Sequence, residues 1–438
     1  MNAVNSGGGE PTAGGEFQTG VAMKLVIVGC LVLLGLVPLT MIRSVLGERQ
    51  MRHREAMENI TSTWGSSQTI AGPILVIPYY RNVKVWKERQ PGNQKDPIDP
   101  PEKTIARAYF LPEELMIGGD LKTERLHRSI YEAVVFRSSL EISGHFAPPS
   151  LAHLKVADGD ILWNEAALLM SITDLRGATQ TLWVKWGDQK IPLVPGGALQ
   201  SIGPVVQARV PIVPGESNSL SFRLPITVNG SVNLRFAPFG LQNRVHLNST
   251  FPDPSFQGAF LPAHRIVTAD GFEADWEVSC YGRAYPQYWT DENPDPLGGD
   301  AFRKSLFGVT IVPAVDSYRY VERSIKYGVL FIALVFAAFF LFEVRALARV
   351  HPVQYTLVGA ALCLFYLALL SLSEVISFES AYWIGAGAST LLVAGYSASV
   401  LGAAARAVLV AGGLFAIYGY MYIVLRQQDY ALIYGTAA

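Results

Sequence analysis

Charged residues are scarce in this chain of 438 residues, where they make up 16%, while hydrophobic residues make up half. Average soluble chains carry about 25% charged residues, so the composition indicates a membrane protein or an unusually apolar globular one. The net charge of −1 provides no overall field that would attract nucleic acid. We therefore expect the lipid bilayer, and no nucleic acid, as a partner.

Cysteine is also rare. The three thiols, at Cys30, Cys280 and Cys363, are too few and too dispersed for a disulfide framework or a thiolate metal site. The seven histidines share no metal-ligand spacing. The sequence contains no P-loop, dinucleotide fingerprint, HExxH or nucleophile elbow. These absences predict no metal, no cofactor and no catalytic residue, so the chain is not expected to be an enzyme.

Long apolar runs gather at the two ends of the chain. Each has about 18–20 residues, the length that crosses roughly 30 Å of hydrocarbon as a helix. We therefore predict an N-terminal anchor helix at 23–42 and a four-helix transmembrane region at 325–425. The five apolar runs are Met23–Ile42, Ile325–Phe342, Val353–Leu372, Tyr382–Leu401 and Ala407–Leu425.

Two tails flank the apolar regions. Residues 1–22 are rich in glycine and poor in apolar residues, a composition that predicts a disordered cytoplasmic tail. Residues 426–438 form a C-terminal tail that could begin a truncated further span.

Basic residues in short loops mark the cytoplasmic side of a membrane protein. Arg345 and Arg406 lie in two of the loops, whereas the loop between them carries Glu374 and Glu379. This pattern places the N-terminus in the cytoplasm and residues 43–324 outside, in the periplasm. Four arginines that follow the first span on the expected outer side run against the rule: Arg43, Arg49, Arg52 and Arg54.

The segment 43–324 consists mainly of short β-type runs broken by proline and glycine. This pattern is typical of a sandwich or barrel, so we predict a β-rich, sandwich-like periplasmic domain. Within LPITVNGSVNLRF, Asn229-Gly230 predicts a hairpin turn. Exposed loops are predicted at Arg89–Lys103 and Asp291–Asp300.

The candidate functional residues are Glu374, Ser373 and Ser371, in the stretch LFYLALLSLSEVISFESAYW. An ionisable side chain inside a span would mark an ion or proton pathway. At the end of a span, the same carboxylate would be a solvated turn residue, with serines bonding back to the helix. We favour the turn, because the sequence suggests no cation in a neighbouring span to pair with Glu374.

Several long motifs occur in the order found in the CreD family of inner membrane proteins, known as the cell envelope integrity family. They include WGSSQTIAGPILVIPYY, RSIYEAVVFRSSLEISGHF and HPVQYTLVGAALCLFYLALLSLSEVISFESAYWI, and the resemblance extends over nearly everything from about Thr40 onward. It implies a bacterial inner membrane location and a role in envelope integrity and envelope stress. It implies no catalytic residue.

Three functions remain open at this point. The first is a non-enzymatic envelope protein whose β-rich module binds or senses a protein or glycan of the envelope. The second is a transporter or lipid-handling protein that uses the C-terminal bundle, with Glu374 near the pathway. The third is a periplasmic hydrolase built on Ser255 and His264, which would need a hydrogen bond between them in a cleft.

Overall fold

The computed structural model divides the chain into two compact units. A helical unit comprises Met1–Glu55 and Val315–Ala438, and a β unit comprises Ala56–Ala314. Backbone is described for residues 13–83, 102–128, 131–154, 156–197, 199, 201–214, 220–311, 317–346, 351–401 and 404–426. Side chains are described for the same residues except 13–22, 82–83, 102, 153, 342, 345–346, 399–401 and 404–406.

These boundaries bear on the predicted tails and loops. Residues 13–22 begin a helix, which differs from the predicted disorder, whereas 1–12 and 427–438 lie outside the described residues. Most of the predicted loop Arg89–Lys103 is also undescribed, and its last two residues begin a strand. The predicted loop from Asp291 forms turns that lead into the short helix α2, Asp300–Ser305. The β unit is shorter at both ends than the predicted segment 43–324.

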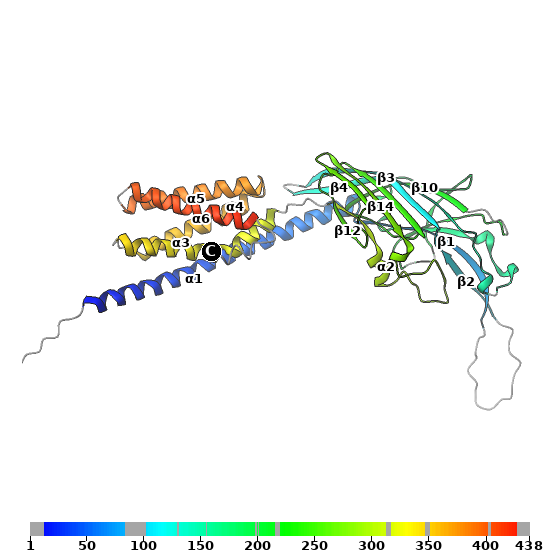
Figure 1. The fold of residues 1–438 in the computed structure, drawn as a ribbon, viewed down its shortest axis with the longest axis horizontal. Helices are drawn as coiled ribbons and strands as arrows, with labels where there is room; N and C mark the ends of the chain where they lie inside the picture. Colours follow the sequence, from blue (N-terminus) through cyan, green and yellow to red (C-terminus); the bar gives the residue numbers. More distant parts are fainter. Residues whose placement is uncertain are drawn as a thin grey trace, which may run out of the picture. The chain divides into compact units, whose positions relative to one another are not determined.

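The apolar runs all form helices (Figure 1). Within the described residues, four helices are long and apolar enough to cross a membrane. The predicted span at Tyr382–Leu401 also forms a helix but is not among the four found in the described part of the chain. The helices are α1 (Ala13–Trp64), α3 (Ser317–Ala346), α4 (Pro352–Leu372), α5 (Phe378–Leu401) and α6 (Ala404–Arg426).

Aromatic side chains fill the core of the helical unit, and the buried tyrosine hydroxyls among them form hydrogen bonds. Tyr382 donates its hydroxyl to the carbonyl of Tyr418, at 2.7 Å. Tyr418 donates to Ser389 Oγ at 3.0 Å, and Ser389 donates to the carbonyl of Ala361 at 3.2 Å. Such a chain of donors lets polar side chains pack between helices without an unpaired group, a requirement that is strict in lipid.

The β unit contains sixteen strands among the described residues, joined into one sheet around a large hydrophobic core, with a smaller cluster of Ile60, Ala133 and Val135 beside it. The main strand order is β13-β14-β11-β3-β4-β10-β1-β5-β9-β8, and Figure 1 shows the long strands β3, β4 and β10. The first eight strands are β1 (Gln68–Val83), β2 (Glu102–Phe110), β3 (Glu114–Arg128), β4 (Tyr131–Phe146), β5 (Ala167–Ile172), β6 (Trp183–Trp186), β7 (Gln189–Pro192) and β8 (Val194–Pro195). The others are β9 (Val205–Arg209), β10 (Leu220–Phe236), β11 (Gln242–Ser249), β12 (Ser255–Gly258), β13 (His264–Thr268), β14 (Gly271–Ser279), β15 (Tyr288–Thr290) and β16 (Phe307–Ile311).

The predicted hairpin at Asn229-Gly230 is wrong, because β10 runs straight through it. The strand pairs with β4 up to Ser231 and with β16 from Val232 onward, where φ is +63°. A Cβ on Gly230 would lie 2.5 Å from the Phe136 ring. The glycine therefore serves close packing where the strand changes partner, not a turn.

A buried polar network secures the junction between the end of α1 and the sheet. Asp174 accepts hydrogen bonds from Ser66 N at 3.0 Å and Ser66 Oγ at 2.9 Å. Arg176 donates to the same carboxylate through Nε and Nη2, both at 2.9 Å. Fully buried Gln68 bridges the carbonyls of Asp174 and Asn229. The Arg176 guanidinium and the Ser66 donors hold the pKa of Asp174 well below its usual range, against the opposing effect of burial.

We predict that Asp174→Asn lowers the free energy of unfolding of the β unit by about 1–3 kcal/mol, because donors lose their charged acceptor. The folded pKa lies below the ordinary value of about 3.9, so the carboxylate contributes stability above that value and loses it as the pH falls through the folded pKa. The gap in melting temperature between wild type and variant should therefore be constant above about pH 5 and narrow below about pH 4.

Thermal unfolding of the full chain in detergent, followed by tryptophan fluorescence, measures this gap. Asp188→Asn is the control, since the Asp188 side chain is fully exposed. A gap that widens in acid would contradict the assignment.

Candidate functional site

Glu374 lies in the turn between α4 and α5. Its Oε2 is 3.5 Å from Nη1 of Arg49 on α1, and Tyr318 on α3 donates its hydroxyl to Oε1 at 3.2 Å. The side chain is only 11% exposed. The expectation that no cation faces Glu374 is therefore wrong, and the carboxylate is ion-paired although it does lie in a turn.

The two candidate serines do not join Glu374 in a site. Ser373 is buried and donates its Oγ to the carbonyl of Leu370, at 3.0 Å, which satisfies the helix end. Ser371 is exposed on the last turn of α4. Glu379 is also exposed and lies 3.7 Å from Arg426.

A second cluster of the same composition involves Glu343, near the end of α3. Its carboxylate is buried, with 6% exposure. It accepts a hydrogen bond from Lys24 on α1 and another from the hydroxyl of Tyr355 on α4, at 3.1 Å. We call this group the Glu343 clamp and the group of Glu374, Arg49 and Tyr318 the Glu374 clamp. Each clamp consists of one acid, one cation of α1 and one tyrosine.

The separation of the clamps matches the thickness of a membrane. Lys24 and Arg49 are roughly 25 residues apart on α1, as are Tyr318 and Glu343 on α3, which corresponds to about 37 Å of helix. The hydrocarbon core of a bilayer is about 30 Å thick. The two clamps are therefore spaced to lie at opposite edges of the hydrocarbon, where their charges cost least.

Charged side chains are otherwise sparse in the interior of the helical unit. Among its described residues, the buried polar side chains besides Glu343 are serines and threonines. An isolated carboxylate in low dielectric costs several kcal/mol unless it is paired and hydrogen-bonded. Both clamps meet this condition, and the described residues contain no chain of ionisable groups between them that would mark a proton or ion path.

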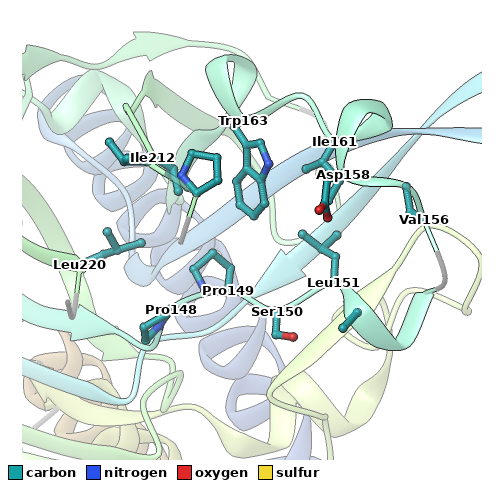
Figure 2. A pocket seen from close by; sticks show the side chains of 13 residues that line it. Pro148, Pro149, Ser150, Leu151, Val156, Asp158, Ile161, Trp163, Ile212 and Leu220 are labelled. Carbon is teal, nitrogen blue, oxygen red and sulfur yellow. The ribbon is translucent and has the colours of Figure 1, made fainter. Parts of the chain in front are cut away.

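The β unit contains a pocket of about 400 Å³, within the range of small-ligand sites. Figure 2 shows the Trp163 ring facing Pro149, with Ile212 and Leu220 on one side and Asp158 on the other. Short 3-10 turns at Asp158–Asp160 and Trp163–Glu165 bring these side chains together. An aromatic ring among prolines with a carboxylate at the rim suits a ligand with an apolar body and a polar or cationic end. The sequence offered no signal for this pocket, because its walls come from separate segments.

The geometry required for a hydrolase is not found in the described residues. Ser255 lies on β12, which pairs with β16, and its Oγ accepts a hydrogen bond from Gln257 at 3.2 Å. His264 lies on β13, which pairs with β14. The part of the chain that the structure describes contains no hydrogen bond between Ser255 and His264.

Apolar helices whose charged clamps are a bilayer's width apart, together with a β-rich unit, define a membrane protein with a large folded domain. The family model "Inner membrane protein CreD" matches residues 20–438. The chain belongs to the CreD family of inner membrane proteins, which confirms the resemblance in the sequence motifs. "Inner membrane protein CreD" of Escherichia coli (strain K12) is 30% identical over 411 residues, which cover 93% of this chain and 87% of that protein.

Solved structures provide little further comparison. An M1 zinc metallopeptidase of Deinococcus radiodurans aligns with 38% of this chain and 40% of its own, at 10% identity and a TM-score of 0.18. A mutant of that enzyme aligns with 38% of each chain, at 9% identity and a TM-score of 0.19. Scores this low carry no argument about this protein.

We predict that Arg49 and Glu374 are energetically coupled. In full-length protein in detergent, the loss in unfolding free energy caused by Arg49→Met and by Glu374→Gln should sum to about 1 kcal/mol more than the loss in the double variant. The physical reason is that either single change leaves the partner charge half-buried and unpaired.

Arg52 and Glu48 supply the matched control, because they form an exposed i,i+4 pair on the same helix. Their cycle of Arg52→Met and Glu48→Gln should give no more than about 0.5 kcal/mol. Equal coupling in the two cycles would show that the Glu374 clamp is an ordinary surface pair.

Proposed function

We propose that this protein supports cell envelope integrity and the envelope-stress response by holding a β-rich, ligand-binding module at the periplasmic face of the inner membrane. The N-terminus is cytoplasmic in this proposal, residues 23–42 form the anchor, and α3 to α6 complete the membrane region. The function needs no catalytic step. The observation that carries the proposal is the pairing of the buried Glu343 and the largely buried Glu374 with cations of α1 in the two clamps.

The clamps support anchoring because each holds α1 against the other helices by an ion pair. Separating either pair would leave a largely buried carboxylate without its cation. Moving α1 by one turn, about 5.4 Å, would break the Lys24–Glu343 and Arg49–Glu374 ion pairs at once. The cost of that slip favours a membrane unit with one fixed arrangement of α1.

The alternative of a transporter or lipid-handling protein would use Glu374 as a group that changes partners. Its present partners argue against this role, since Arg49 and Tyr318 occupy both carboxylate oxygens. The pocket described above lies in the β unit and contains no residue of the bundle. Ligand recognition is therefore better supported for the β unit than for the bundle.

A charge exchange distinguishes anchoring from transport. In a strain that lacks this gene, we expect Glu374→Gln to rescue survival of envelope stress only partly, because the clamp is weakened. The double variant Arg49→Glu/Glu374→Arg should restore rescue, because it rebuilds the ion pair with reversed polarity. Membrane levels of each variant are matched by immunoblot.

The exchange also has an outcome that overturns the proposal. If the double variant folds and accumulates normally but still fails to rescue, the carboxylate at position 374 is needed for itself. The bundle would then have to be treated as a transport or proton-coupled device.

The pocket provides a test of ligand binding by the module. Ala152 lines the pocket and is exposed, so Ala152→Trp should obstruct it without disturbing the core. We expect reduced rescue of envelope stress at an unchanged membrane level and melting temperature. The control is Ala157→Trp, at an exposed neighbour outside the lining. Equal rescue by the two variants would remove the pocket from the proposed function.

A further inference from the structure

The exposed face of the sheet brings together three metal-ligating side chains from two neighbouring strands. His246 on β11 stands directly opposite Asp275 on β14 in the strand register. Its Nδ1 is 2.7 Å from Asp275 Oδ1, and its Nε2 is 3.9 Å from Glu273 Oε1. One ligand atom from each of the three residues lies within 4.8 Å of the other two.

A fourth ligand is available from the next strand. His264 on β13 stands opposite Asp275 from the other side. Directly opposed residues in antiparallel strands share a face, with Cβ atoms about 4.5–5.5 Å apart. The His264 side chain is exposed, so its ring is free to turn toward the cluster. The donor set is thus two imidazoles and two carboxylates from three adjacent strands.

The charges of the cluster favour a cation. Among the ion pairs of the described residues, Glu273 and Asp275 have His246 as their partner. The neighbouring Glu114 on the same face is instead neutralised by Arg244, at 3.0 Å. Two carboxylates that share one imidazole carry an excess of negative charge, and a divalent ion would compensate it.

We propose that His246, Glu273 and Asp275 bind a divalent transition-metal ion of the Zn²⁺ class, with His264 or water as the fourth ligand. Imidazole nitrogen favours Zn²⁺, Ni²⁺ or Cu²⁺, whereas Ca²⁺ and Mg²⁺ prefer oxygen ligands alone. The ligands of such an ion must be deprotonated, so affinity falls as the pH is lowered. The ion would join β11 to β14 and, through His264, to β13 at the end of the strand order.

Isothermal titration of metal-free, full-length protein in detergent with zinc chloride tests this site. We expect one Zn²⁺ per chain and a rise in melting temperature, since an ion that binds only the folded state stabilises it. His246→Ala and Asp275→Asn should each weaken binding by at least about tenfold. His264→Ala should weaken it less if water replaces the ring. These side chains lie on the exposed face, where substitutions leave folding largely intact.

The matched control is His127→Ala. His127 is an exposed histidine of the same unit that lies 3.3 Å from Glu132, without a second acid on its ring. This variant should bind Zn²⁺ like the wild type. Absence of Zn²⁺ binding, an equal loss of affinity in His127→Ala, or equal binding of Ca²⁺ and Zn²⁺ would each overturn the proposal. Full Zn²⁺ binding by Asp275→Asn would overturn it as well.

Discussion

The cost of placing a carboxylate beside hydrocarbon governs the helical unit. Glu343 and Glu374 are both largely buried, and each is matched by a cation of α1 and a tyrosine hydroxyl. A buried ion pair contributes little net stability compared with apolar packing, but breaking one is expensive because it leaves an unpaired charge. The clamps therefore determine the position of α1 against α3 and α4 more than they add stability.

The same rule operates in the β unit, at the junction of the end of α1 with the sheet. Asp174 collects the donors of Ser66 and Arg176, and Gln68 satisfies the carbonyls around it. A Cβ on Gly65 would lie 2.6 Å from the carbonyl oxygen of Asn229, so this approach requires glycine. The motif WGSSQ thus has a physical role in ending the helix at Trp64 and starting the first strand at Gln68.

Local patterns predicted the elements of this fold and failed on contacts between distant segments. Apolar runs of spanning length gave the helices, because hydrophobicity is a property of each segment. The hairpin prediction at Asn229-Gly230 failed, because the sequence does not distinguish a glycine needed for close packing from a glycine needed for a turn. The partner of Glu374 was missed because Arg49 is on another helix, although its breach of the positive-inside rule was a signal. The strand register places His246 opposite Asp275. A search of the sequence for metal-ligand spacing could not find this pair, because the two residues lie on different strands.

The two units differ in the polar groups that they leave available to a ligand, and this difference bears on what the protein does. In the described part of the helical unit, the carboxylates of Glu343 and Glu374 have partners. The core hydroxyls of Tyr382, Tyr418 and Ser389 each donate a hydrogen bond. The β unit instead offers a pocket with an aromatic wall and a cluster of acids that share one imidazole. A transport mechanism needs groups in the membrane that exchange partners, whereas a binding module needs them outside. Among the described residues, the pocket and the acid cluster that could bind a ligand lie in the β unit, which is why we propose recognition by this unit.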